Sequence, residues 1–388
     1  MQAHTQQTRE PAPVVLVGAH GHGQWHLSNL RRLADAGRVR LVGVCDRVPV
    51  AREDLHGLGE PAHSDDLGEL LAATGAAVTV VATPIHTHLP LARVALAHGS
   101  HVLLEKPPAA TLADHEALTA EVSRSGLACQ IGFQNLGSTA VDAAAELARS
   151  GAIGAVRGVG GAGAWQRTSA YYARAPWAGR RRIEGTDVVD GALTNPFAHA
   201  VITALRLAGA DRQVAEEVEL ELFHAHPIES DDTSCMRVRA PDGTPVTVAV
   251  TLCATTAADP YVSINGDHGR ITLHYTRDEI SVLRPGAEAQ ALVHGRTDLL
   301  ENLLNHVAAG TPLLVPPEAT TGFMSVLEAV RTAPDPRPLP EEHQRIDTSG
   351  ADVHRTVKGI DELVERSAAE MALFSELGAP WANAEVIP

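Results

Sequence analysis

Short apolar runs alternate with amphipathic segments along the first third of the chain. Each run is rich in β-branched residues and ends at a polar or turn-forming residue, and the runs occupy 13–18, 39–46, 76–84, 100–107 and 127–135. Between several of them, apolar residues recur at helical spacing, at 22–37, 87–99 and 114–126. Buried strands that alternate with amphipathic helices predict an α/β fold with a doubly wound parallel sheet.

After Asn135 the pattern changes to longer, alternating segments. One helix is predicted at 138–151, and alternating strands follow at 214–223, 233–243, 244–254, 261–275 and 278–285. Because such strands are apolar on one face only, they predict a large open, mostly antiparallel sheet that is polar on its other face. Two helices near 297–309 and 317–332, a proline-rich connector at 332–344 and a helical segment at 351–378 are expected to follow.

The chain length of 388 residues fits two domains of about 150 residues with additions. The pattern places the boundaries as follows: a frayed tail at 1–13, the doubly wound domain at 14–134, a second α/β domain at 135–340 and a C-terminal helical extension at 341–388.

Composition narrows the class of protein. The net charge of −16 argues against general nucleic-acid binding, which needs a positive footprint. No apolar run reaches the ~18 residues of a membrane span, so no membrane association is expected. The four cysteines show no paired spacing, and we interpret them as reduced, buried thiols of a cytoplasmic protein.

The first strand runs into a glycine-rich turn and then into a helix. A dinucleotide site needs a tight turn, close approach of the backbone to the pyrophosphate and a helix N-terminus aimed at the phosphates. The GxGxxG pattern requires glycine at 18, 20 and 23, and here position 20 is histidine. The expected cofactor-binding residues of this turn are Gly18, His20, Gly21, His22 and Gly23. The alternative is a glycine turn without a cofactor.

The second strand ends in Asp46, 23 positions after Gly23. A carboxylate at about this spacing binds the adenosine ribose of NAD. Asp46 therefore favours NAD, whereas the adjacent Arg47 could face the 2′-phosphate of NADP and keeps that cofactor as the second choice.

Histidines at positions 20, 22 and 26 raise the question of a metal site. With 20 histidines in the chain, close pairs are expected by chance. No acidic residue or cysteine lies at ligand spacing from these histidines, so the sequence predicts no metal site.

Further motifs follow three later strands. They are Thr83-Pro84 with His88 beyond, Glu105-Lys106-Pro107, and Gly132-Phe133-Gln134-Asn135. With the glycine turn they resemble the Gfo/Idh/MocA family over residues 13 to about 330. The resemblance implies a Rossmann domain, a substrate domain whose open sheet forms a homo-oligomer interface (dimer or tetramer), and NAD(P)-dependent chemistry on sugars. It adds Thr83, Pro84, His88, Glu105 and Lys106 to the cofactor-binding residues, and Gln134 to the substrate-binding ones.

The family's second signature, Asp-x-x-x-His, corresponds to Asn195-Pro196-Phe197-Ala198-His199, with asparagine in place of aspartate. We expect Asn195 to cap a helix and Pro196 to begin it. Hydride transfer from a carbinol carbon needs a base and a group that stabilises the alkoxide. We assign His199 as the base, Lys106 as the polarising group and Asn195 as a substrate ligand.

Five of the 13 aromatic residues fall within 165–197, interleaved with arginines. Aromatic faces pack on sugar C–H surfaces, and guanidinium groups bind hydroxyls or anions. The expected substrate residues here are Trp165, Arg167, Tyr171, Tyr172, Trp177 and Arg180. The arginines hint at an anionic substrate, although Asp187 and Asp190 could pair with them instead.

These observations predict an NAD-dependent oxidoreductase acting on a hydroxyl of a sugar, sugar acid, glycoside or cyclitol. One alternative is an NAD-dependent glycoside hydrolase that works by transient oxidation and elimination, for example on sulfoquinovosides. The other is a non-catalytic NAD-binding sensor, supported by the substitutions at positions 20 and 195.

Overall fold

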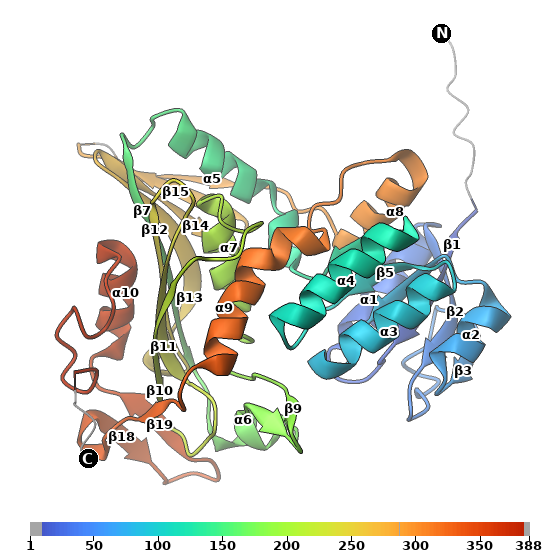
Figure 1. Ribbon diagram of the computed structural model, residues 1–388, viewed down its shortest axis with the longest axis horizontal. Coiled ribbons are helices and arrows are strands. Elements are labelled where there is room, and N and C mark those ends of the chain that lie inside the picture. The colour runs from blue at the N-terminus through green and yellow to red at the C-terminus, as the bar shows by residue number, and fades with distance from the viewer. Residues whose placement is uncertain (1–9, 287, 384–388) are drawn as a thin grey trace. The chain divides into compact units, whose positions relative to one another are not determined.

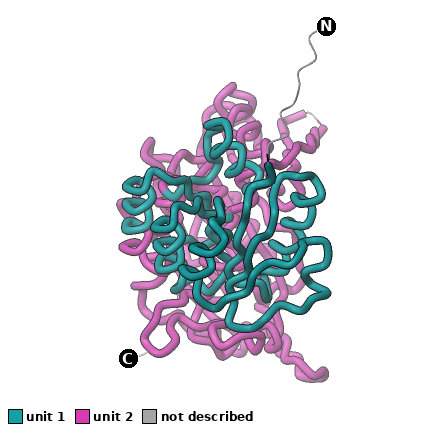
Figure 2. Tube along the Cα trace, turned by 90° about the vertical axis from the view of Figure 1, so that its right-hand side faces the viewer, with its two compact units in different colours: residues 1–108, 116–132, 299–317 teal, residues 109–115, 133–298, 318–388 magenta. Residues whose placement is uncertain are grey.

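The computed structural model describes residues 10–286 and 288–383, and the chain divides into two compact units (Figures 1 and 2). Unit 1 comprises 1–108, 116–132 and 299–317, and unit 2 comprises 109–115, 133–298 and 318–388. Most of the expected tail, residues 1–9, lies outside the described residues. Residues 299–317, which the sequence places in the second domain, group with unit 1 instead.

Unit 1 is built on a six-stranded parallel sheet of order β3-β2-β1-β4-β5-β6. Its strands are β1 (Ala12–Val17), β2 (Val39–Cys45), β3 (Ala62–Ser64), β4 (Val78–Val81), β5 (His101–Leu104) and β6 (Cys129–Ile131). Its helices are α1 (Gly23–Asp35), α2 (Leu67–Thr74), α3 (His88–Ala97), α4 (Leu112–Ser125, whose first turn counts with unit 2) and α8 (Leu299–Ala309), with a 3₁₀ turn η1 (Ile85–Thr87). This confirms the doubly wound prediction, although β3 and α2 were not expected.

The strand register brings the ends of four strands to one edge of this sheet. Val17 of β1 lies beside Cys45 of β2 and Val81 of β4, and Val81 lies beside Leu104 of β5. The residues that follow these strands therefore meet at the carboxyl edge, where ligands bind in doubly wound sheets. β4 is fully buried, as expected for a strand covered by helices on both faces.

Unit 2 contains a nine-stranded mixed sheet of order β16-β15-β14-β13-β7-β12-β11-β10-β17, in which only the β7–β12 and β10–β17 pairs are parallel. Its strands are β7 (Val156–Gln166), β10 (Val218–His224), β11 (Thr233–Arg239), β12 (Pro245–Thr251), β13 (Cys253–Gly266), β14 (Gly269–His274), β15 (Glu279–Leu283), β16 (Gln290–Val293) and β17 (Arg337–Pro338). The mostly antiparallel sheet is confirmed, but segment 261–275 is a hairpin of β13 and β14.

Helices and short strands complete unit 2. They are α5 (Thr139–Arg149), α6 (Ser169–Ala173), α7 (Ala198–Leu207), α9 (Thr321–Thr332) and α10 (Ile360–Glu370), the 3₁₀ turns η2 (Gln134–Gly137), η3 (Pro317–Thr320) and η4 (Glu341–His343), and the strands β8 (Arg182–Ile183), β9 (Thr186–Asp187), β18 (Gln344–Asp347) and β19 (His354–Val357). The prediction of one helical segment at 351–378 was wrong, because its start pairs with β18 as a strand and the helix ends at Glu370.

The strand β7 was also missed, because its glycine-rich sequence has little intrinsic preference for a strand. Those glycines have a packing reason. A Cβ on Gly160 would lie 1.8 Å from the carbonyl oxygen of Ala368 in α10, so only glycine allows this helix to lie against the sheet. Figure 1 shows α10 on one face of the sheet and α7 on the other.

The packing of α10 against the large sheet also corrects the prediction that this sheet has one polar, solvent-facing face. Ala249 of β12 and Cys235 of β11 pack with Val364 of α10 in one buried cluster. On the same strands Thr247 and Thr251 are fully buried, and the hydroxyl of Thr251 lies 2.9 Å from that of Thr233. The face predicted to meet water is thus covered here by the C-terminal helix.

Candidate functional site

The glycine turn of unit 1 packs closely against neighbouring backbone. Gly18 has φ +80°, and a Cβ there would lie 2.6 Å from the carbonyl oxygen of Ala82. A Cβ on Gly23 would lie 2.1 Å from the carbonyl oxygen of Gly18, so both positions require glycine. His20, which replaces the middle glycine, is exposed, and its Nε2 lies 3.2 Å from the Val48 carbonyl oxygen. This glycine cradle therefore forms without the middle glycine, and α1 begins directly after it, as a diphosphate site needs.

Asp46 lies beside this turn, at the end of β2. Its Oδ2 accepts a hydrogen bond from the backbone N–H of Ala19 at 2.9 Å, and its Oδ1 accepts one from Val48 at 3.1 Å. Both bonds fix the carboxylate at the carboxyl edge of the sheet. Arg47 is exposed next to it.

Glu105 follows β5, but its carboxylate turns towards α1. Its Oε1 lies 3.0 Å from Nε2 of His26 and 3.4 Å from Nε2 of His22. Burial alone would raise the pKa of Glu105, but the hydrogen bonds and charges of the two histidines outweigh it and hold the pKa well below its usual range. Gly132 makes room for the carboxylate, since a Cβ there would lie 2.8 Å from Oε1.

The neighbouring motif residues tie the loops after β4 and β5 together. His88 is buried, with Nε2 at 2.8 Å from the Thr83 carbonyl oxygen and Nδ1 at 2.8 Å from the Pro107 carbonyl oxygen. Burial lowers the pKa of His88. Pro84 is exposed, and Lys106 is half-buried, with its backbone N–H donating to Glu105 Oε2 at 3.2 Å. His88 thus bridges two loops of the edge rather than facing solvent.

In unit 2, His199 lies in the first turn of α7 and is held by Asn135. The Nδ1 of His199 is 2.6 Å from Oδ1 of Asn135, whose Nδ2 donates to the hydroxyl of Thr203 and to the His199 carbonyl oxygen. An amide oxygen only accepts, so Nδ1 carries the hydrogen and a neutral ring has Nε2 as its acceptor. Asn135 belongs to the motif at 132–135, but the sequence predicts no role for it. Its neighbour Gln134 is half-buried at the start of η2.

Asn195 does not cap α7 as expected. The helix begins at Ala198 with Phe197 as the capping residue, whose side chain makes no capping hydrogen bond. Instead the Nδ2 of Asn195 donates to Oδ1 of Asp190 at 2.6 Å. Asp190 is buried, and its Oδ2 accepts from the Gly179 backbone at 2.7 Å. A carboxylate therefore lies next to position 195 after all, supplied from five residues earlier.

Four of the side chains expected to bind substrate form a stacked ladder with Arg174, which was not expected to bind substrate. The guanidinium of Arg167 lies 5.0 Å from the ring centre of Trp165 and 5.1 Å from that of Tyr171. Arg174 lies 3.6 Å from the Tyr171 ring and 4.6 Å from that of Trp177, and 3.6 Å from the Asp190 carboxylate. Such cation–π contacts hold arginines in defined orientations.

The remaining residues of this segment have other partners. Tyr172 buries its hydroxyl and packs its ring 4.9 Å from His226. Arg180 is exposed and pairs with Glu229 at 3.5 Å. Arg181 donates to the carbonyl oxygens of Val330, Arg331 and Ala333 at the end of α9, and Arg182 pairs with Asp187 at 2.8 Å. Asp190 thus pairs with Arg174 and Asp187 with Arg182, as in the alternative that the sequence left open.

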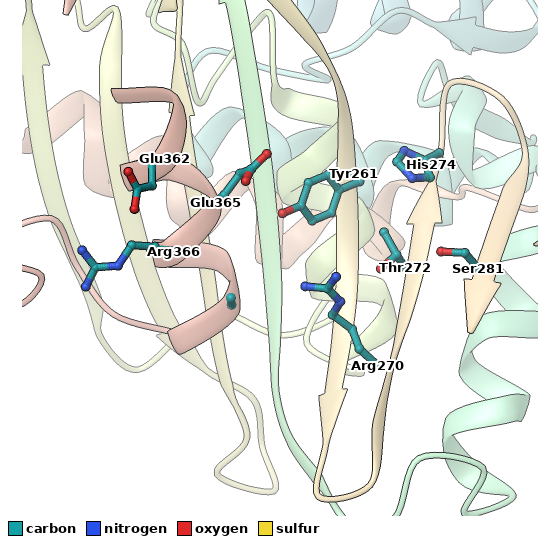
Figure 3. A pocket seen from close by; sticks show the side chains of 9 residues that line it. Tyr261, Arg270, Thr272, His274, Ser281, Glu362, Glu365 and Arg366 are labelled. Carbon is teal, nitrogen blue, oxygen red and sulfur yellow. The ribbon is translucent and has the colours of Figure 1, made fainter. Parts of the chain in front are cut away.

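A hollow of about 430 Å³ lies on the α10 side of the large sheet (Figure 3). Tyr261 of β13, Arg270 and His274 of β14, and Glu365 of α10 are among the residues around it. His199 belongs to α7 on the other side of the sheet (Figure 1). The hollow is thus separate from His199, because the sheet lies between them.

The fold and the glycine cradle define the class as a Rossmann-type nucleotide-binding protein with a second sheet domain. Residues 13–133 match the model of the Gfo/Idh/MocA oxidoreductase family, described as an NAD-binding Rossmann fold, and residues 141–272 match the family's C-terminal domain. The chain belongs to the Gfo/Idh/MocA oxidoreductase family, and its first domain is the NAD-binding Rossmann domain.

Among curated relatives, scyllo-inositol 2-dehydrogenase (NAD(+)) of Bacillus subtilis (strain 168) is 31% identical over 116 residues, 29% of this chain and 32% of that protein. The 1-carboxy-3-chloro-3,4-dihydroxycyclo hexa-1,5-diene dehydrogenase of Comamonas testosteroni is 29% identical over 200 residues, 51% of this chain and 48% of that protein. The chain thus spans about a third to a half of the length of these relatives.

Among solved structures, the WlbA dehydrogenase of Bordetella pertussis in complex with NADH and UDP-GlcNAcA superposes with a TM-score of 0.67. It is 21% identical and the match covers 82% of this chain and 95% of that one, which establishes a shared fold. Within the described ranges, no helix has the length and apolar character needed to cross a membrane.

Proposed function

We propose that the protein is an NAD-dependent dehydrogenase that oxidises a hydroxyl of a sugar, sugar acid or cyclitol by hydride transfer. The observation that carries this proposal is the hydrogen bond between His199 Nδ1 and Asn135 Oδ1. It fixes the tautomer in which Nε2 accepts a proton, which a base for alcohol oxidation requires. The family membership and the names of the relatives support the same reaction.

Lys106 is proposed as the group that stabilises negative charge on the reacting oxygen. It follows β5 at the carboxyl edge of the Rossmann sheet, and its backbone is fixed by Glu105. Asn195, oriented by Asp190, and Gln134 are proposed to bind substrate hydroxyls. When bound, NAD supplies the hydride acceptor, and the protein provides proton transfer, orientation and charge stabilisation.

The cofactor is proposed to be NAD, with NADP as the weaker ligand. The N–H groups around Gly18, Gly21 and Gly23 would hold the diphosphate, and Asp46 would accept from the ribose hydroxyls. A 2′-phosphate next to Asp46 would face a fixed negative charge. Arg47 is exposed and could offset it only in part.

An anionic substrate is supported by the arginine ladder and by one relative whose name includes a carboxy group. Arg167 is proposed to bind the anionic group of the substrate, because its guanidinium is oriented by the rings of Trp165 and Tyr171. Arg174 already faces Asp190, and Arg181 is committed to the end of α9.

The protein is also proposed to be a cytoplasmic homo-oligomer. The four cysteines are buried and unpaired, which fits a reducing compartment. Because α10 covers the β7–β12 part of the sheet, the proposed contact lies over β15 and β16, where Leu283, Leu292 and Val293 are 48%, 49% and 77% exposed. Light scattering of Val293→Lys against wild type tests this contact.

The experiment that tests the function is a screen of sugars, uronates, cyclitols and aryl glycosides with NAD and NADP. Reduced nicotinamide and released aglycone are recorded together. Net NADH formation with a polyol or sugar acid supports the dehydrogenase. Aglycone release without net NADH would replace it with the redox-neutral glycosidase, and NAD binding without either product would replace it with a sensor.

A further inference from the structure

We propose that His22, His26 and Glu105 form a binding site for a zinc-type divalent cation. The sequence predicts no metal site here, because no acid lies at ligand spacing from these histidines. The fold overturns that premise by bringing Glu105 to His26 across 79 positions of the chain. Their three ligand atoms all lie within 4.8 Å of one another.

The ligand types suit such an ion. Two histidines and one glutamate make a ligand set that binds zinc in enzymes, with the fourth position left to water or a ligand. His22 caps α1 and His26 lies four residues later, so both side chains are on one face of the first helical turns. Both present Nε2 to the same oxygen of Glu105.

The distances between the donor atoms also suit a zinc ion. At bond lengths of about 2.0–2.2 Å, two ligands of a tetrahedral zinc ion lie about 3.3–3.6 Å apart. The distances from Glu105 Oε1 to the two Nε2 atoms are 3.0 and 3.4 Å. An ion could therefore be accommodated with small shifts of side chains rather than movement of the backbone.

The cluster is rigid on one side and accessible on the other. His26 and Glu105 are buried, and the His26 ring packs edge-on against Trp25 at 5.0 Å. Among the described residues, nothing forms a hydrogen bond with Nδ1 of His26, so Nε2, which faces Glu105, holds the ring in place. His22 has 55% of its side chain exposed, which leaves an entry path for the ion from solvent.

A second cluster with ligand types is less suitable. His226, Asp232 and Cys253 are all buried in unit 2. Both carboxylate oxygens of Asp232 already accept backbone N–H bonds from Ala225 and His226 at 2.8–2.9 Å. Burial raises the pKa of Cys253, which opposes the thiolate that a metal needs. This cluster serves as the competing location in the test.

The test is calorimetric titration of ZnCl₂ into the full chain, free of tags and metal. A single saturable equivalent is expected, and His22→Ala and Glu105→Gln should each weaken Zn²⁺ binding about tenfold or more. His56→Ala, at an exposed histidine outside the cluster, is the matched control and should leave binding unchanged. If Glu105→Gln does not fold, the result for His22→Ala decides the test, because replacing the exposed His22 should not disturb folding.

Cobalt substitution locates the ion independently. Co²⁺ bound by nitrogen and oxygen ligands should show d–d absorption without the sulfur charge-transfer band that Cys253 would cause. The proposal is overturned if Zn²⁺ does not bind saturably, if binding survives in His22→Ala, or if His226→Asn abolishes it while His22→Ala does not.

Discussion

Asn135 Oδ1 accepts a hydrogen bond from Nδ1 of His199 at 2.6 Å, across 64 positions of the chain. Its amide nitrogen is bonded to Thr203 on α7, so the amide cannot turn without losing a second bond. This pair selects the His199 tautomer that can accept a proton through Nε2. The proposed role of His199 as the base requires this tautomer.

Replacing Asn135 with leucine should therefore lower kcat about 10- to 100-fold with little change in KM. The ring would remain in place but lose the bond that sets its tautomer and orientation. Steady-state kinetics with the substrate found in the screen measure this. A variant that changed KM but not kcat would make Asn135 a binding residue instead.

Lys106→Ala and His199→Ala should each reduce turnover about 10²–10⁴-fold, the usual cost of losing a proton-transfer or charge-stabilising group. NAD affinity and the circular dichroism spectrum should stay close to wild type, since neither substitution removes part of the glycine turn. Near-normal kcat in either folded variant would remove that residue from the proposed mechanism.

Asp46→Ala should weaken NAD binding and narrow the preference for NAD over NADP. The carboxylate supplies the negative charge that opposes a 2′-phosphate and also holds Ala19 of the turn. Calorimetry with both cofactors measures the change, and Arg47→Ala should weaken NADP binding without weakening NAD binding. If the wild-type protein bound NADP more tightly than NAD, Arg47 would be the residue that recognises the 2′-phosphate.

Arg167→Ala should raise KM strongly for an anionic substrate and little for its neutral analogue. A charge-assisted hydrogen bond is worth about 1.5–3 kcal/mol, or roughly 10- to 150-fold in kcat/KM. Arg180→Ala is the control, because that side chain is exposed and paired with Glu229. Equal losses on both substrates in Arg167→Ala would exclude charge recognition by this residue.

Acidification should destabilise unit 2 through His115. Burial lowers the pKa of His115 from 6.5 to about 4, so between these values the unfolded chain binds a proton that the folded chain does not. The stabilising contribution is present above pH 6.5 and is lost as the pH falls through 4, amounting to about 3 kcal/mol. Denaturant unfolding of His115→Gln should show a smaller loss of stability between pH 7 and pH 4 than wild type.

The predictable parts of the fold are those with a local signal. β1, at Ala12–Val17, was expected at 13–18 because a β-branched run ends in glycine. β7 was not, since its glycines serve the approach of Ala368, a contact that no local pattern shows. The sequence wrongly predicts helix at β19 (His354–Val357), because the pairing with β18 that makes it a strand is not visible in the local pattern.

The candidate site likewise has parts with a local sequence signal and parts that depend on long-range contacts. Motifs located Asp46, Lys106 and His199, whose roles remain predictions. The hydrogen-bond partners of the motif residues could not be predicted, because Glu105 contacts His26 and Asn135 contacts His199 only in the folded chain. Asn195 and Asp190 are only five residues apart. The sequence nevertheless predicts Asn195 as the cap of α7, whereas its amide donates to Asp190.

The most direct test of the central claim follows the hydride itself. A substrate identified in the screen is deuterated at the carbon that is oxidised and incubated with wild-type protein and NAD, and the nicotinamide is analysed by mass spectrometry. The account predicts reduced cofactor carrying one deuterium, with the label absent from water and the signal lost in His199→Ala. Product formation with the deuterium released to water, and none in the nicotinamide, would contradict it.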